Sequence, residues 1–306
     1  MDRYEEMRAL VAVVESGSFS AAAEQLGQAK SMISRRVGEL EKRLGARLIQ
    51  RTTRRLRLTD AGWVFHERAR RLLSDLEEAE GLVRSEQCTL SGRLRVSAPL
   101  SFGLRHMGDA IAEFCRQHPR LRLDLEFNDR RVDLIEEGFD MALRIGKLED
   151  SSLMARRVTA VSMVTVAGVA YLDCHGVPAE PLELNEHSGL YYSLGGKTAW
   201  RYLDQNGRLL QPKPSVRYTS NNGDHLLDMA IAGLGIAIMP RFIVHEALGQ
   251  GDLVALLENY TLPGAGMYLV FPPGRFQSRR ARVFGEFLTE RFSGEVPWER
   301  SGGGED

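Results

Sequence analysis

Ten basic side chains gather in one short stretch of this 306-residue chain, where they could bind phosphate groups. The stretch runs from Gln28 to Leu58 and holds only two acidic residues, although the whole chain has a formal net charge of −1. The ten are Lys30, Arg35, Arg36, Lys42, Arg43, Arg47, Arg51, Arg54, Arg55 and Arg57. A solvated charged surface would explain any one of these residues, but not their segregation. Positive charge concentrated in this way neutralises a nucleic-acid backbone, so the stretch predicts a DNA-binding surface.

The residue patterns of catalytic and metal sites are incomplete in this sequence. Gly195–Thr198 reads like the end of a phosphate-binding loop, but that loop needs a glycine five positions before Gly196, where the chain has Tyr191. No Gly-x-Ser-x-Gly motif occurs, and the seven histidines lack metal-ligand spacing. We therefore expect no enzyme activity, no cofactor and no metal site.

The chain has three cysteines, Cys88, Cys115 and Cys174. An odd number of cysteines suits a reducing compartment, and a redox role for one of them stays open.

Three helices must position the basic residues. A first helix ends at Gly17, and Ser18 is a good N-cap for a second over Phe19–Leu26, which Gly27 closes. The third begins at Lys30, and steps of three and four put its apolar residues on one face: Ile33, Val37, Leu40 and Leu44. The opposite face carries Ser31, Arg35, Gly38 and Lys42. A helix with one apolar face and one small, polar and basic face suits the DNA major groove.

A hairpin with one basic face is expected after the third helix. Leu48–Arg51 predicts a strand, Thr52–Arg54 the turn and Arg55–Leu58 the return strand. In the return strand arginines alternate with leucines, so one face is basic and the other apolar. Three helices followed by such a hairpin are typical of a winged helix-turn-helix domain, which reads duplex DNA.

The order of these motifs is similar to that of the LysR-type transcriptional regulators. The segments that carry the resemblance are Ser16–Ala23, Ile33–Val37, Leu40-Glu41, Leu44-Gly45 and Arg51–Gly62, and the match continues to near residue 292. The resemblance implies that the recognition helix contacts DNA through Ala29, Lys30, Ser31, Met32, Ser34, Arg35 and Arg36. It implies that the wing contacts DNA through Arg51, Thr52, Thr53, Arg54 and Arg55.

Two positions depart from the family pattern. Ala29 stands where the family often has a serine or threonine cap, and Ser31 where it often has proline. The missing cap should weaken the start of the third helix by ~1 kcal/mol unless Gln28 compensates. Both departures concern which operator sequence is read, and neither changes the expected docking mode.

A long helix is predicted after the hairpin, from Asp60 to about Gln87, with Thr59 as its N-cap. Apolar residues recur along it at alternating steps of four and three: Phe65, Ala69, Leu72, Leu76, Ala79 and Val83. This heptad seam predicts a linker helix that pairs two chains. The alternative is an amphipathic helix that lies on its own domain. Pairing would let two recognition helices enter successive major grooves, roughly 34 Å apart.

From Gly92 onward strands and helices alternate, which predicts a parallel sheet with helices on its faces. The expected strands are Leu94–Ala98, Arg122–Phe127, Met141–Ile145, Val161–Val166, Gly235–Met239 and Tyr268–Phe271, with others near Tyr191 and Val216. The expected helices are Leu104–Gln117, Val132–Glu137, Asp224–Ala232 and Ser278–Phe292, with another near Ala170. The family resemblance implies two α/β lobes, like a periplasmic binding protein, with crossovers near Thr159–Met163 and Glu258–Gly266.

The expected effector site lies between those lobes. Ligands of open α/β sheets bind beyond the carboxyl ends of strands, and the family's inducer cleft is lined at the same positions. These are Leu100, Ser101, Phe102, Asn128, Arg144, Asn221 and Asn222. Helix N-termini with hydroxyl, amide and guanidinium donors favour an organic or aromatic acid. Two alternatives stay open: Asn221–Gly223 as a plain turn and cap, and Arg144 paired internally with Asp140 or Asp129.

The predicted fold class is α/β with an N-terminal winged helix-turn-helix, a long linker helix and a C-terminal two-lobe periplasmic-binding-protein-like effector domain. The expected divisions are residues 1–59, 60–88 and 91–300, with lobe I at about 91–161 plus 267–300 and lobe II at about 162–266. The function predicted is an effector-controlled, sequence-specific transcriptional regulator. Its expected partners are double-stranded DNA with an interrupted inverted repeat, itself as a homodimer or homotetramer, a small-molecule effector and, through the resemblance, RNA polymerase.

No membrane partner is expected. No apolar run approaches the ~18 residues of a membrane helix, and the acidic start of the chain differs from a signal peptide. The predicted location is therefore the cytoplasm.

Overall fold

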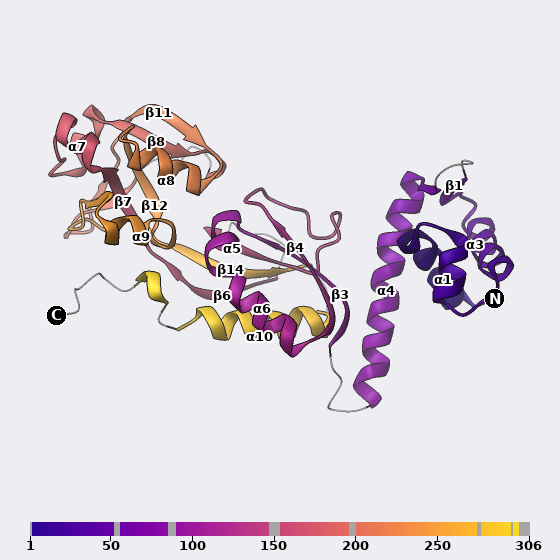
Figure 1. Ribbon diagram of the computed structural model, residues 1–306. Coiled ribbons are helices and arrows are strands. Elements are labelled where there is room, and N and C mark those ends of the chain that lie inside the picture. Colours follow the sequence, from indigo (N-terminus) through magenta and orange to yellow (C-terminus); the bar gives the residue numbers. More distant parts are fainter. Residues whose placement is uncertain are drawn as a thin grey trace. The chain divides into compact units, whose positions relative to one another are not determined.

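The computed structural model describes residues 2–51, 56–84, 90–146, 154–195, 200–273, 277–294 and 296–299. The chain divides into two compact units, Met1–Gly92 and Arg93–Asp306 (Figure 1). The first is mostly helical and the second is built on two five-stranded sheets. Among the described residues, no helix combines the length and the apolar character needed to cross a membrane.

The first unit is a winged helix-turn-helix with a long helix after it. Its elements are α1 (Arg3–Ser16), α2 (Phe19–Gln25), α3 (Lys30–Leu44), β1 (Ile49–Arg51), β2 (Leu56–Leu58) and α4 (Asp60–Arg84). The two strands pair antiparallel, with Ile49 opposite Leu58. The predicted caps are confirmed, because the Ser18 hydroxyl accepts the N–H of Ala21 at 3.1 Å and the Thr59 hydroxyl accepts the N–H of Gly62 at 2.9 Å.

The apolar face of α3 packs into the core of this unit. Ile33, Val37 and Leu40 are at most 1% exposed and contact residues of α1 and α2. The prediction for Leu44 is wrong, since this last residue of the helix is 38% exposed. Ala29 makes no side-chain cap bond, and Gln28 does not replace it. The Gln28 amide instead accepts a hydrogen bond from Arg36 at 2.7 Å and lies 3.4 Å from a Glu5 oxygen.

Acidic side chains hold α3 against its neighbours. Glu6 on α1 is 2% exposed, and its Oε2 accepts hydrogen bonds from Nε and Nη2 of Arg43 at 3.0 and 2.7 Å. Glu5 pairs with Arg36 in the same way. In the last turn of α3, close to Arg43, Glu41 Oε1 accepts the backbone N–H groups of Leu48 and Ile49 at 2.7 and 3.0 Å. These bonds join the recognition helix both to α1 and to the hairpin.

The second unit contains two lobes, each with a mixed five-stranded sheet. Lobe I holds β3 (Ser91–Ala98), α5 (Leu100–His106), α6 (Gly108–Gln117), β4 (Arg120–Phe127), β5 (Met141–Gly146), β6 (Met154–Val161), β14 (Ala265–Phe271) and α10 (Arg279–Phe292), with strand order β4-β3-β5-β14-β6. Lobe II holds β7 (Met163–Gly168), α7 (Val169–His175), β8 (Ser188–Tyr192), β11 (Ser215–Ser220), α8 (Gly223–Ile231), β12 (Ile236–Pro240), α9 (Arg241–Gln250) and β13 (Leu253–Leu256), with strand order β11-β8-β12-β7-β13. Lobe II also carries the small hairpin of β9 (Tyr202–Leu203) and β10 (Leu209–Leu210) and the 3₁₀ turns Pro181–Glu186 and Ser193–Gly195, and a third such turn, Pro297–Glu299, follows α10.

The strands that carry the chain between the lobes pair antiparallel with their neighbours. The prediction of a parallel sheet is therefore wrong. The chain leaves lobe I along β6 and enters lobe II as β7, and it returns along β14. Strand β14 runs antiparallel to both β5 and β6, and β7 runs antiparallel to both β12 and β13. Parallel pairing in the described sheets joins β3 to β5, β11 to β8 and β12 to β8. Each sheet is therefore mixed.

Two predicted helices of lobe I are also wrong. The expected helix Leu104–Gln117 is divided into α5 and α6 at the buried Met107, just before Gly108, a poor helix former. The expected helix Val132–Glu137 is a single turn. Asp133 Oδ1 caps the turn by accepting the N–H groups of Ile135 and Glu136 at 2.8 and 2.9 Å, and Gly138, at a φ of 78°, ends it after that one turn.

Replacing Arg43 with Met should destabilise the first unit, because the buried Glu6 carboxylate would lose its charge partner. Breaking such a pair from one side removes about 3 kcal/mol from the free energy of unfolding. Urea unfolding followed by circular dichroism measures the effect. The matched control is Lys42→Met, at the exposed neighbouring position, which should change the free energy by less than ~0.5 kcal/mol. Equal unfolding midpoints for the two variants would contradict this role of Glu6.

Candidate functional site

The exposed face of α3 matches most of the predicted recognition residues. Ala29, Lys30, Ser31, Met32 and Arg35 are exposed, and Ser34 is half-buried. We call these six residues the recognition face. The Arg35 side chain is 75% exposed, and its Nε donates to Glu39 Oε1 at 2.8 Å. That hydrogen bond and the charge of Glu39 raise the pKa of Arg35, and they hold the side chain along the outer side of the helix.

Arg36 has a different environment from the recognition face. Its side chain is 23% exposed, and its Nη1 atom is shared between Glu5 and the Gln28 amide oxygen. Both partners belong to the same unit. Arg36 therefore anchors α3 to α1, and its expected contact with DNA stays a prediction.

The structure describes only the base of the wing hairpin, so the predicted DNA contacts of the wing stay a prediction. The side chain of Arg51 and all of Thr52, Thr53, Arg54 and Arg55 lie outside the described residues. In β2 the predicted alternation is confirmed, since Leu56 and Leu58 pack against the domain core while Arg57 between them is exposed.

Helix α4 uses its first apolar residues within its own unit. Ala69 is 1% exposed and packs with Val11 of α1 and Leu73, and Phe65 joins the same cluster. The prediction that Ala69 contacts a second chain is therefore wrong. Leu72 and Leu76, farther along the helix, are 57% and 42% exposed. The side chains of the two remaining seam positions, Ala79 and Val83, lie outside the described residues.

Polar residues meet at the carboxyl ends of the lobe I strands, as predicted. Strands β3 and β5 are parallel, so Arg144 near the end of β5 lies at the same edge as the loop after β3. Arg144 Nη2 donates to Ser97 Oγ at 2.8 Å, and Nη1 donates to the Leu143 carbonyl at 2.9 Å. Burial lowers the pKa of the Arg144 guanidinium, and the charge of Asp129 opposes that shift. No ion pair of the described residues includes Arg144.

Lobe II supplies a carboxylate to the same place. Ser101 Oγ donates to Asp224 Oδ2 at 2.6 Å, and Arg105 Nε donates to Asp224 Oδ1 at 2.6 Å. Ser101 and Arg105 belong to α5 of lobe I, whereas Asp224 lies in the first turn of α8. The lobes approach closely here, because a Cβ atom at Gly223 of lobe II would lie 3.2 Å from Ser101 Oγ of lobe I. We call this group of Ser101, Arg105 and Asp224 the carboxylate bridge.

A second carboxylate, that of Asp129, also lies at the predicted site. Asp129 Oδ1 accepts the Leu100 N–H at 3.1 Å. Burial raises the pKa of Tyr192 of lobe II, and the charge of Asp129 and its hydrogen bond with Tyr192 raise it further. Asn128 donates to Ser97 Oγ and to Glu126 Oε1, while its buried Oδ1 has no hydrogen-bond partner among the described residues. That oxygen is free to accept a donor from a bound molecule.

Three of the predicted effector residues have other roles or positions. Phe102 is 0% exposed and packs edge-on against Phe242, Phe292 and Trp298, so the prediction that it lines the site is wrong. Asn222 is the N-cap of α8, and its Oδ1 accepts the His225 N–H at 3.1 Å, which confirms the alternative of a turn and cap. Asn221 is exposed beside it.

Three residues of the site were missed in the sequence, namely Arg105, Tyr192 and Asp224, and Asp129 was considered only as an internal partner of Arg144. Arg105 stands four positions after Ser101, on the same face of α5, and Asp129 directly follows Asn128. Asp224 follows the Asn-Asn-Gly turn at the start of a helix, where acidic residues are common. Only the pairing across the lobes shows that these side chains belong together. Among the described residues, no cluster of His, Cys, Asp and Glu side chains could hold a metal ion.

The chain is similar to transcriptional regulators over nearly its whole length. Residues 4–63 match the family model of the bacterial regulatory helix-turn-helix protein, lysR family, and residues 88–293 match that of the LysR substrate binding domain. An uncharacterized HTH-type transcriptional regulator of Haemophilus influenzae is 37% identical, covering 90% of this chain and 96% of the relative. The regulator CrgA of Neisseria meningitidis serogroup C is 35% identical, covering 95% and 98%.

Solved structures agree with these matches. The structure of CrgA, a LysR-type transcriptional regulator from Neisseria meningitidis, superposes with a TM-score of 0.60 at 34% identity, covering 96% of this chain and 100% of that one. The full-length structure of the Vibrio cholerae virulence activator AphB gives a TM-score of 0.59 at 27% identity, covering 95% and 100%. The matched domains and relatives are regulators and not enzymes.

Proposed function

Because the chain belongs to the family of LysR-type transcriptional regulators, we propose that it reads an operator through α3 and the wing and responds to an organic acid bound between its lobes. The observation that carries the first part is the division of charge around α3. Arg36 and Arg43 bind glutamates of α1, whereas Lys30 and Arg35 stay on the recognition face. A helix anchored on one side and basic on the other enters the major groove with its outer side chains against the bases.

Two copies of the chain would bind one operator. Leu72 and Leu76 lie one turn apart on α4 and are exposed, and apolar pairs at this spacing associate as coiled coils. The operator is then an interrupted inverted repeat, with half-sites roughly 34 Å apart or a multiple of that distance. We extend the proposal to a homotetramer, to contact with RNA polymerase and to a cytoplasmic location, which follows from DNA as the partner.

The effector would compete with the carboxylate bridge. Ser101 and Arg105 are donors suited to a carboxylate, and in this structure Asp224 of the other lobe occupies them. An organic acid that accepts hydrogen bonds from Ser101 and Arg144 would displace Asp224 from Ser101. The contact between the lobes would then change. No resident cofactor is needed for this exchange. A ligand acts in this way only to the extent that it binds one lobe arrangement better than the other.

Replacing Arg35 with Ala should reduce operator discrimination. The loss of one base contact weakens specific binding by about 1–3 kcal/mol, while binding to random DNA changes little. Electrophoretic mobility shift at several salt concentrations measures both affinities. The control is Arg57→Ala on the exposed side of β2, where loss of a phosphate contact weakens both by a similar factor. Equal losses on both DNAs for Arg35→Ala would count against base reading by this residue.

Replacing Leu72 with Glu should drive the protein toward monomers and leave the first unit folded. A carboxylate at this exposed seam position would be buried against its copy in the dimer, which is unfavourable without a partner. Sedimentation velocity reports the oligomeric state, and circular dichroism verifies the fold. An intact dimer of the folded variant would refute the role of Leu72.

Replacing Asp224 with Asn should strengthen binding of the effector acid by about tenfold, because the internal competitor loses its charge. Thermal-shift titration with a panel of organic acids, benzoate among them, gives the apparent affinities, since a ligand of the folded state raises its stability. Asp228→Asn is the control, because Asp228 is exposed one turn farther along α8. Unchanged or weaker acid binding by Asp224→Asn would show that Asp224 does not compete with the effector.

A further inference from the structure

A short turn after α10 lies against both lobes. This 3₁₀ turn, Pro297–Glu299, continues from lobe I and contacts α9 of lobe II (Figure 1). Trp298 and the preceding Val296 are each 6% exposed. A buried side chain of the size of tryptophan removes about 150–250 Å² of surface from water, so the turn is docked in the fold through its side chains. We call residues 296–299 the strap.

The ring of Trp298 completes an aromatic cluster between the lobes. Its centroid lies 4.1 Å from that of His106 and 5.7 Å from that of Phe102, both on α5 of lobe I. These two residues also contact α9 of lobe II, since Phe102 packs edge-on against Phe242 at 5.4 Å and His106 Nε2 donates to the Phe242 carbonyl at 2.9 Å. Removal of the Trp298 ring would leave a cavity beside both partners of Phe242.

The carboxylate of Glu299 binds the connection between the lobes. Ser162 stands between β6 and β7, where the chain passes from lobe I to lobe II. Its N–H donates to Glu299 Oε1 at 3.1 Å, and its carbonyl accepts the N–H of Arg241, the first residue of α9, at 2.9 Å. A hinge moves by changing the φ and ψ angles of a few such residues. Both hydrogen bonds of Ser162 oppose that change, and one of them comes from the strap.

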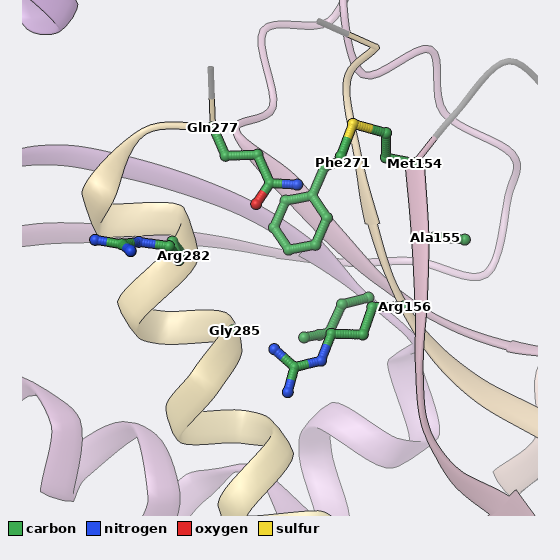
Figure 2. A pocket seen from close by; sticks show the side chains of 8 residues that line it. Met154, Ala155, Arg156, Phe271, Gln277, Arg282 and Gly285 are labelled. Carbon is green, nitrogen blue, oxygen red and sulfur yellow. The ribbon is translucent and has the colours of Figure 1, made fainter. Parts of the chain in front are cut away.

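Helix α10 by itself covers the connecting strand incompletely. Strand β6 is at the edge of the lobe I sheet. A hollow of about 210 Å³ lies between this strand and α10, and its lining includes Met154 and Arg156 of β6 and Gly285 of α10 (Figure 2). The helix therefore leaves the beginning of β6 partly uncovered, whereas the strap binds Ser162, directly after the end of that strand.

We propose that the strap holds the two lobes in the arrangement seen here, and that the lobes rotate about Ser162 only when Trp298 leaves the aromatic cluster. The strap is joined to lobe I through α10, and its contacts reach α9 and the hinge, so it restrains one lobe against the other. It shares no residue with the carboxylate bridge. Its restraint therefore acts whether or not an acid binds between the lobes.

Double electron–electron resonance between the lobes of the full-length protein tests the proposal. One nitroxide is placed on lobe I through Glu286→Cys, at an exposed position of α10, and the other on the exposed native Cys174 of lobe II. Cys88→Ser and Cys115→Ser remove the other two thiols. Dilution with unlabelled protein removes the distances between copies. No acid is added, so a failure of the proposed effector site leaves this measurement unaffected.

Trp298→Ala should broaden the distribution of interlobe distances about twofold, because a hinge without the strap samples a wider range of rotations. Glu299→Ala should broaden it less. Glu299→Gln, which keeps an oxygen that accepts the Ser162 N–H, should leave the distribution nearly unchanged. Glu290→Ala is the matched control, since Glu290 is exposed on α10, and it should have no effect.

Circular dichroism melts distinguish a strap from a contact that only stabilises lobe I. A Trp298→Ala protein that melts at a lower temperature but keeps the narrow distance distribution would overturn the proposal. Broadening by Glu290→Ala equal to that by Trp298→Ala would overturn it as well. If Trp298→Ala does not fold, Glu299→Ala decides with Glu299→Gln as its reference, and identical distributions for these two variants would contradict the role of the strap.

Discussion

The DNA-binding unit depends on two glutamates at the start of α1. Glu6 is almost fully buried, and its carboxylate is stable there only because Arg43 binds it. Glu5 holds Arg36 in the same manner, so two arginines of α3 point inward. These contacts set the rotation of α3 about its own axis. With its apolar side and two arginines held inward, Lys30, Ser31 and Arg35 face solvent. The excess of positive charge in the sequence is therefore divided between anchoring the helix and binding DNA.

Helix α5 has the corresponding role in the effector unit, because one short helix makes two kinds of contact with lobe II. Phe102 packs against Phe242, and the His106 ring bonds the Phe242 carbonyl at 2.9 Å. Burial lowers the pKa of His106 and so favours the neutral form of this ring. The carboxylate bridge, by contrast, is polar and partly exposed. In the proposed function, an anion replaces Asp224 in the bridge while the apolar contact between Phe102 and Phe242 is kept.

Patterns that act over a few residues were predicted well, and arrangements that depend on distant segments were not. The caps at Ser18 and Thr59 and the core face of α3 follow from local hydrogen bonds and periodicity, and the structure confirms them. The seam of α4 failed at Ala69 because the same apolar period serves an intramolecular contact with α1. Phe102 was misplaced because nothing local distinguishes a core aromatic from a ligand contact. Asp224 escaped notice because its partners are more than a hundred positions away.

In the proposed function, the carboxylate bridge also constrains how the protein senses an acid. Asp224 is a competitor built into the chain, present at an effective concentration on the order of millimolar or above. An acid that binds Ser101 must exceed this competition, so its apparent affinity falls by the factor that the bridge contributes. The same competition sets the free energy with which binding shifts the lobes, because a ligand moves an equilibrium only by its difference in affinity for the two states. Under this proposal, weak apparent binding and strong coupling have one cause, the hydrogen bonds of Ser101 and Arg105 to Asp224.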